Sequence, residues 1–405
     1  MAQRHHDLTD PAAGPVTTGD ALAGYLRGQA TEFLRALRLH RETGGAVSNG
    51  ASGASAGGAV SAEVRVDAVR ALRRSARRIS GSLHTFRPLL EPEWSEAIRP
   101  ELAWLSGTLA LEHAYGARLE RLLLALNRLS GAAPVPVPGQ AAGPAGSTGS
   151  PGSAGSSGST GSAGPHGSAG PHGSAGPHGS AGPHGNDRSA VHPAIPDRGN
   201  LTVGAAKAGA LLDRQLTLAR TRAHSTALQA LGSSRFHAVA DKVAVLASEV
   251  PLTPAAPATA LHPLASAAEE RLADAVTALP LVTAGSPYNA EALVHGLSPD
   301  PAPHPQDAPW HQVRLLLRLH RYACEVVHGR STPLDLRLLT AGEALDRHRD
   351  ASEASSAAAQ AARTPRIAPA TAYALGVLHA DQRHEVEAAR YAFQRSWQKQ
   401  TVGAP

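Results

Sequence analysis

The chain has few of the residues that build several common kinds of site and segment. It holds one cysteine, Cys324, among 405 residues, which excludes an internal disulfide and a zinc site built from several cysteines. It contains no run of about 18 apolar residues, so we expect no transmembrane helix. The first 20 residues lack a basic end followed by an apolar core, so we expect no secretory signal and a cytosolic protein.

Lysine is also scarce. Of the 38 lysine and arginine residues, only Lys207, Lys242 and Lys399 are lysines, which leaves 35 arginines, and the formal net charge is +5. A GC-rich genome raises arginine together with alanine, glycine and proline. The positions of the arginines must therefore decide whether this basicity serves a function.

A long segment of low complexity interrupts the chain. Residues 131–200 are mostly Gly, Ser, Ala and Pro, and a repeated six-residue unit places histidines at 166, 172, 178 and 184. Such a segment buries too little apolar surface to offset its ordering entropy, so we predict a disordered linker between halves 18–130 and 201–400. Spaced histidines can bind transition metals weakly, but nothing fixes their geometry, and a simple spacer is the favoured interpretation. We expect shorter flexible loops at 44–58 and 285–309.

The rest of the chain has helical periodicity almost throughout. Apolar residues recur three or four positions apart, and alternating strand patterns are absent. The predicted helices cover residues 21–41, 62–90, two helices within 93–129, 203–231, 234–246, 265–279, 310–328, 334–362 and 370–400. We therefore predict an all-α fold in which helices pack as two bundles.

The charge concentrates on residues 64–87. Seven arginines and one aspartate give this segment +6, so the remainder of the chain is close to neutral. At about 100° per residue, Arg70, Arg73 and Arg77 lie beside the apolar stripe of the predicted helix. Arg74 and Arg78 lie further round, and Arg78 is expected to point furthest from the core.

The arginines of this helix lack acids with which to form pairs along it. No acidic residue occurs between Arg70 and Arg87, so ion pairs at i,i+4 do not neutralise them. Clustered positive charge without partners repels itself. An anionic ligand is therefore favoured over an ordinary solvated surface.

Residues 310–328 repeat the pattern. One face of this second helix holds four basic residues at spacings of three, four and three: His311, Arg314, Arg318 and Arg321. A shift of 241 positions overlays residues 70, 73 and 77 on residues 311, 314 and 318. The repeat predicts an internal duplication with pseudo-twofold symmetry, in which the two basic faces meet around a shared groove or pore.

These motifs resemble the CHAD domain (conserved histidine α-helical domain) family. The stretch 69–86 matches the family's first basic helix with five residues in register: Arg73, Arg77, Arg78, Leu83 and Phe86. Arg70 stands where the family has its histidine, whereas the second helix keeps that histidine as His311. A third motif at 345–350 retains His348 and Asp350. The matching first-half motif at 113–116 lacks both of its acids.

The resemblance covers residues 18–400 and implies a function. It implies two bundles around a central basic surface that binds inorganic polyphosphate without catalysis, in the cytoplasm or on polyphosphate granules. We expect no membrane partner, no cofactor and no metal. The chain also lacks the Glu-x-Glu-x-Lys strand of the catalytic CYTH domain that often accompanies this family. The expected polyphosphate-binding residues are Arg70, Arg73, Arg74, Arg77, His311, Arg314, Arg318, Arg321 and His348.

The chemistry of polyphosphate suits such a surface. It is a flexible polyanion without bases, and arginine binds phosphate oxygens in pairs with a charge that is fixed at any cellular pH. We expect His311 and His348 to add charge only below about pH 6.5.

Two other functions stay open. A nucleic-acid-binding module would use the same charge, but no aromatic residue interleaves the basic arc for base stacking. A phosphohydrolase would need clustered acids for a metal, and Asp346, His348 and Asp350 are the candidates. We favour ion pairing of these acids with Arg347 and Arg349.

Overall fold

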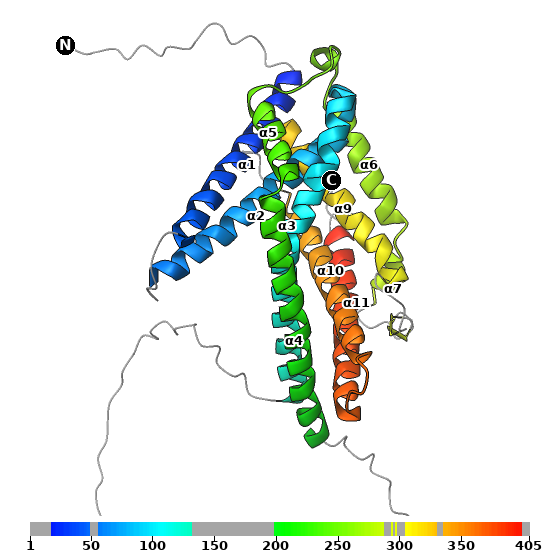
Figure 1. Ribbon diagram of the computed structural model, residues 1–405. Helices are drawn as coiled ribbons and strands as arrows, with labels where there is room; N and C mark the ends of the chain where they lie inside the picture. The colour runs from blue at the N-terminus through cyan, green and yellow to red at the C-terminus, as the bar shows by residue number, and fades with distance from the viewer. Residues whose placement is uncertain are drawn as a thin grey trace, which may run out of the picture. The chain divides into compact units, whose positions relative to one another are not determined.

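The computed structural model describes residues 18–48, 56–131, 198–286, 293–294, 296–297, 304–329 and 335–398 (Figure 1). Within these ranges the only β pairing is a single antiparallel bridge between Leu90 and Leu252. The predicted all-α fold is therefore confirmed. The α-helices are α1 (Thr18–Ser48), α2 (Ala56–Thr85), α3 (Pro92–Ser130), α4 (Arg198–Leu231), α5 (Ser234–Ser248), α6 (His262–Thr277), α7 (Leu281–Ala284), α9 (Ala308–His328), α10 (Leu336–Ala362) and α11 (Pro369–Gln398).

The prediction of two helices within residues 93–129 is wrong, because α3 is one continuous helix with Pro100 inside it. Proline inside a helix removes one backbone hydrogen bond and crowds the preceding turn. Here the buried stripe of Ile98, Leu102, Leu105 and Leu109 continues past Pro100 in one register, and Pro100 itself is exposed. Burial along the whole stripe outweighs the local cost.

The short loops are shorter than expected. The helix α1 continues to Ser48 and α2 begins at Ala56, so most of the predicted loop 44–58 is helical. The predicted loop 285–309 ends in a 3₁₀ turn, η3 (Pro305–Asp307), that leads directly into α9. The predicted disordered linker lies outside the described residues, apart from Gly131, which caps the end of α3, and its last three residues, which begin α4.

Three cores of buried apolar side chains hold the helices together. The first lies among α1, α2, α5, the N-terminal part of α3 and the C-terminal part of α9. The second lies among the C-terminal part of α3, α4, α10 and α11, and the third among α6, α9, α10 and α11. The helices on either side of the central segment, up to residue 133 and from residue 198, thus form one compact unit. The division into halves 18–130 and 201–400 stays a prediction.

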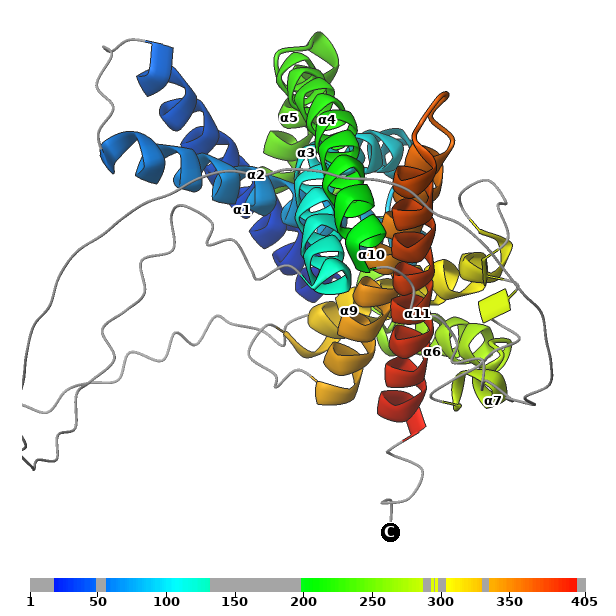
Figure 2. The ribbon, with the colours of Figure 1, turned by 90° about the horizontal axis from the view of Figure 1, so that it is seen from below.

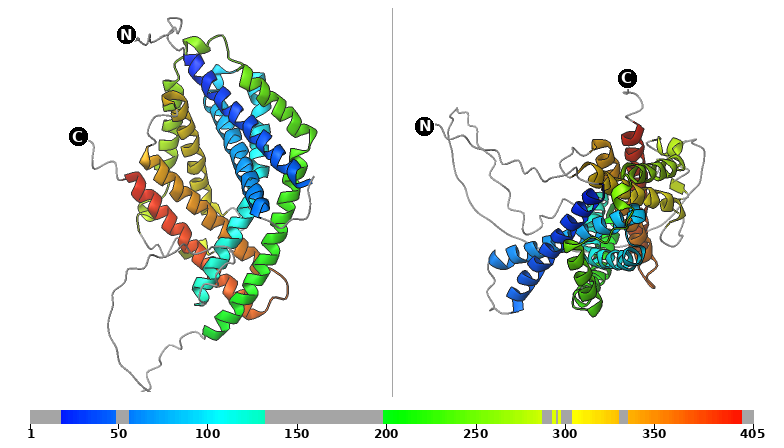
Figure 3. Two further views of the ribbon diagram at one scale, coloured as in Figure 1. Left: turned by 90° about the vertical axis from the view of Figure 1, so that its left-hand side faces the viewer. Right: turned by 90° about the horizontal axis from the view of Figure 1, so that it is seen from above.

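The packing brings distant parts of the sequence together. The helices α10 and α11 lie side by side along their length, and α4 packs against both α3 and α11 (Figures 1 and 2). The helix α2 packs along α1 and also contacts α9 (Figure 3). The two helices with basic faces, α2 and α9, are therefore direct neighbours.

Candidate anion-binding site

The helix α2 holds its arginines at the edge of the first core. Leu72, Ala76 and Ile79 are fully buried and fix the rotation of the helix. Arg73 and Arg77 lie beside this stripe and are half-buried, as the sequence predicts, whereas Arg70 and Arg74 are exposed. Packing of the apolar stripe thus determines which arginines are partly buried and which stay exposed to solvent.

The crossing of α2 and α9 depends on a glycine. A Cβ atom at Gly81 would lie 2.6 Å from Cδ2 of Tyr322, closer than real Cβ contacts. Glycine therefore permits a close approach of the two helices, because a larger residue here requires the Tyr322 ring to shift. One turn before this point, Arg77 of α2 and Arg318 of α9 are electrostatic neighbours.

Six arginines from three helices surround this crossing, and we call them the basic cluster. The basic cluster consists of Arg70, Arg73 and Arg77 of α2, Arg314 and Arg318 of α9, and Arg349 of α10. Burial and the neighbouring charges of Arg73 and Arg318 lower the pKa of Arg77 to about 9. Burial and the charges of Arg349 and Arg318 also lower the pKa of Arg73. These shifts mean that the folded protein holds like charges together at a cost.

Half of the basic cluster has acidic partners. Arg70 pairs with Asp67 at 3.0 Å, Arg314 with Asp346 at 2.5 Å, and Arg349 with Asp350 at 2.6 Å. The other three, Arg73, Arg77 and Arg318, have no acid within ion-pair distance among the residues that the structure describes.

Arg78 lies in a different place from the one predicted. Its guanidinium donates to Glu325 of α9 at 2.8 and 3.2 Å, and its side chain is only 21% exposed. The hydroxyl of Tyr25 donates to the same carboxylate at 2.9 Å. Arg78 therefore points toward α9 and joins α1, α2 and α9, and Arg74 is the exposed member of the pair.

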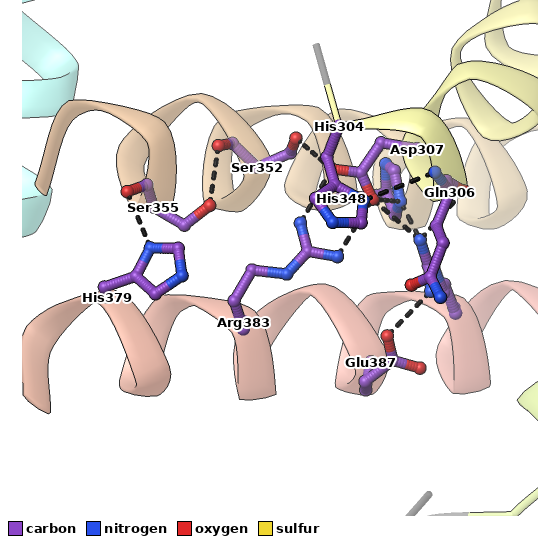
Figure 4. Close-up of polar contacts among 10 residues, drawn as sticks. His304, Gln306, Asp307, His348, Ser352, Ser355, His379, Arg383 and Glu387 are labelled. Carbon is purple, nitrogen blue, oxygen red and sulfur yellow. Dashed lines mark hydrogen bonds and ion pairs between the residues drawn. The ribbon is translucent and has the colours of Figure 1, made fainter. Parts of the chain in front are cut away.

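The structure leaves His348 without access to a ligand, contrary to its predicted role. Its side chain is 1% exposed, and it lies in a buried polar network (Figure 4). Burial lowers the pKa of His348 to about 4, so its ring is neutral near pH 7, and Nε2 accepts a hydrogen bond from Arg390 at 3.3 Å. The expected gain of charge from this residue below pH 6.5 is therefore wrong.

The centre of that network is the carboxylate of Asp307, which is fully buried. Arg383 donates to it at 2.7 and 3.2 Å, Arg390 at 2.7 Å, and the hydroxyl of Ser352 at 2.5 Å. Burial would raise the pKa of Asp307, but its contacts with His348 and Arg383 hold it far below its ordinary value. Because Asp307 directly precedes α9, the network fixes the start of the second basic helix against α10 and α11.

His311 and Arg321 lie at the margin of the site. The ring of His311 packs edge-on against His348, and burial lowers the pKa of His311 below its ordinary value. A Cβ atom at Gly342 of α10 would lie 3.8 Å from Nη1 of Arg321. The guanidinium of Arg321 is thus next to α10, away from the contact between α2 and α9.

The sequence did not predict Arg349 as a member of the basic cluster, because its neighbouring acids led to an ion-pairing interpretation. Arg349 does pair with Asp350, and also with Glu353, whereas Asp346 pairs with Arg314 and not with Arg347 or Arg349 as predicted. Arg349 is at the same time the strongest charged neighbour of Arg73. His113 of α3 is a second addition, since the charges of Arg70 and Arg73, after burial, lower its pKa. The position of Arg349 directly after the recognised His348 is the one sequence signal for it.

Comparison with known proteins agrees with this architecture. The family model described as "CHAD domain" matches residues 56–359. The chain belongs to the CHAD domain family. A solved structure, PptA from Streptomyces chartreusis, is 60% identical, and the match covers 95% of this chain and 100% of that chain with a TM-score of 0.67. No curated protein matches the chain.

None of the described helices is long and apolar enough to cross a membrane. No group of three or more His, Cys, Asp or Glu residues in the described part of this CHAD protein is placed to hold a metal ion.

Proposed function

We propose that this CHAD protein binds inorganic polyphosphate through the basic cluster and does so without catalysis. The observation that carries the proposal is the set of three half-buried arginines, Arg73, Arg77 and Arg318, that face one another across two helices without acidic partners. A polyanion supplies the missing negative charge at several of these positions at once. The chain belongs to the CHAD domain family, and the resemblance of its motifs to this family implies the same ligand.

The proposal also includes the predicted duplication. Under the shift of 241 positions, Arg77 corresponds to Arg318 and Gly81 corresponds to Tyr322, and each of these residues is a neighbour of its own counterpart. Residues near a twofold axis contact their own copies, so this pairing supports a pseudo-twofold axis between α2 and α9. A single phosphate chain along that axis would contact both helices.

Nucleic acid is the first alternative. It would also neutralise the basic cluster, but sites for single strands use several aromatic rings on which successive bases stack. Tyr322 lies at the crossing of α2 and α9, but among the described residues no other Phe, Tyr or Trp side chain lines the pocket beside it. We therefore expect phosphate contacts without a series of stacked bases.

An enzyme acting on polyphosphate is the second alternative. The acids near the site, Asp346 and Asp350, form ion pairs with Arg314 and Arg349, which leaves them poorly placed for a metal ion. Burial raises the pKa of the Cys324 thiol, so it is a weak nucleophile. Release of phosphate from polyphosphate in the presence of divalent metals would contradict the non-catalytic proposal.

The decisive experiment is a binding titration at several salt concentrations, with long-chain polyphosphate against single-stranded and duplex nucleic acid at equal charge concentration. If all six arginines displace a counterion, the slope of log K against log salt is about −4. Nucleic acid that displaces polyphosphate at equal charge concentration would overturn the choice of ligand.

Two double variants test whether both helices face one ligand. We expect Arg73→Glu with Arg77→Glu, and Arg314→Glu with Arg318→Glu, each to weaken polyphosphate binding by at least about tenfold. The control is Lys207→Glu with Arg214→Glu, which makes the same change of charge on exposed positions of α4. A loss in only one of the two test variants would contradict the shared site.

A further inference from the structure

A pocket beside the basic cluster is lined by both cationic and apolar side chains, and polyphosphate has no apolar part to contact the latter. It lies among α2, α3 and α9, and encloses about 590 Å³. Its lining includes two of the unpaired arginines, Arg77 and Arg318, which also belong to the basic cluster. A ligand bound by the basic cluster therefore has direct access to this space.

Apolar side chains supply much of the remaining lining. They come from α3 and α9 and comprise Pro100, Ala103, Leu315, Leu319 and Tyr322. Leu315 is 47% exposed, although it lies beside two guanidinium groups. Polyphosphate is polar along its whole length and gains nothing from such contacts.

The other charged groups of the pocket already have partners. Arg99 donates to Glu96 at 2.7 Å and contacts Nδ1 of His84 at 2.9 Å. The hydroxyl of Ser106 donates to the carbonyl of Ala103 at 3.1 Å. Among the described residues that line the pocket, the unpaired cations are Arg77 and Arg318 at the side of the basic cluster. The charge that is free to bind a ligand is thus at one end of the pocket.

We propose that this pocket binds the base of a nucleoside polyphosphate whose phosphate chain lies on Arg77 and Arg318. Such a compound has the two parts that the lining requires, a flat ring system next to an anionic chain. The volume exceeds that of one nucleoside and falls within the range of small-molecule sites. The proposal goes beyond polyphosphate binding and relies only on the ability of the basic cluster to hold phosphate.

The experiment compares ATP with inorganic tripolyphosphate by isothermal titration calorimetry, in EDTA at fixed ionic strength. Both compounds carry three phosphorus atoms, but one phosphate of ATP is esterified, so charge alone favours tripolyphosphate. We expect ATP to bind about tenfold more tightly, because the base buries apolar surface in the pocket. Equal or weaker binding of ATP would overturn the proposal.

Two variants of α3 locate the effect. Ala103 is exposed and lines the pocket, so Ala103→Trp fills the space without disturbing the core. It should reduce ATP binding about tenfold and change tripolyphosphate binding less than about twofold. Ala97→Trp, at an exposed position of α3 outside the lining, is the matched control and should change neither. ATP binding that survives Ala103→Trp would show that the base lies elsewhere.

A third variant tests the apolar lining itself. Leu315→Gln keeps the size and charge of an exposed side chain but removes apolar surface, and should lower the preference for ATP over tripolyphosphate. The two proposals fail separately. Binding of polyphosphate and tripolyphosphate without a preference for ATP refutes only the pocket, whereas binding of ATP alone refutes only the proposed function.

Discussion

Replacing Arg77 by methionine should stabilise the protein and at the same time weaken its binding of polyphosphate. Arg77 is half-buried between Arg73 and Arg318, and has no acidic partner among the described residues. Methionine has a similar length and keeps the contacts of the aliphatic stem. The substitution thus removes a charge that the folded state holds at a cost.

The pKa of Arg77 sets the scale of this cost. Burial and the neighbouring arginines lower it from its ordinary value to about 9. Because each pKa unit corresponds to about 1.4 kcal/mol, the upper limit is about 5 kcal/mol, and solvent near the half-buried group reduces this to about 1–2 kcal/mol. A cation with a lowered folded pKa destabilises the protein at every pH below about 9, and the cost disappears as the pH rises from there toward the ordinary pKa of arginine.

The assay is thermal unfolding of parent and variant at low and high salt, without ligand. We expect Arg77→Met to raise Tm by about 2 °C or more at low salt, and by less at high salt because screening weakens the repulsion in the parent. Long-chain polyphosphate should then raise the Tm of the parent more than that of the variant, since the ligand relieves the repulsion only where it exists.

Arg74→Met is the matched control for this prediction. Arg74 lies on the same helix and carries the same charge, but it is exposed. Its substitution should change Tm by no more than about 1 °C. A fall in Tm with Arg77→Met, or an equal rise with both variants, would refute the idea that repulsion inside the basic cluster destabilises the free protein.

Three further predictions concern the framework of the site. Gly81→Ala should lower Tm and weaken polyphosphate binding, because the added Cβ atom would lie 2.6 Å from Cδ2 of Tyr322. Gly107→Ala, whose Cβ atom would meet nothing within 4 Å, should do neither. Asp307→Asn should lower the free energy of urea unfolding by about 3 kcal/mol, because it removes the negative charge that neutralises buried arginines. Asp346→Asn, which changes an exposed acid, should lower it by less than about 1 kcal/mol. The lowered pKa of His348 predicts that stability falls between pH 6.5 and about 4, by up to about 3 kcal/mol, and that His348→Gln flattens this dependence in acid unfolding.

Helical periodicity predicted most of the fold, because apolar stripes survive in the structure as buried faces. The stripe from Leu72 to Phe86 is buried, and its rotation correctly placed Arg73 and Arg77 at the edge of the core. The error within residues 93–129 came from Pro100, where local propensity favours a break. The unbroken apolar stripe from Ile98 to Leu109 predicts one continuous helix, and this is the structure observed, since tertiary packing outweighs local propensity.

Periodicity on one helix did not reveal partners on another. Arg78 lies on the less buried side of α2 in a helical projection, yet Glu325, 247 residues away, binds it. In the same way, His348 is a polar residue on an alanine-rich helix. The charged residues that surround it come from other elements and are Asp307, Arg383 and Arg390. The helical projection thus predicted the partial burial of Arg73 and Arg77 correctly. It did not predict burial where a second element covers the side chain, as at Arg78 and His348.

The predicted duplication would explain why positive charge gathers at this place. Near a twofold axis each residue meets its own copy, so one arginine on an ancestral helix produces two adjacent charges, as Arg77 and Arg318 are here. A bulky residue at the same axis would collide with its copy, and one of the two must become small. Gly81 opposite Tyr322 is such a pair. Restoring symmetry with Gly81→Tyr should therefore force α2 from α9, whereas Tyr322→Gly should leave the crossing open and remove only the ring beside the pocket.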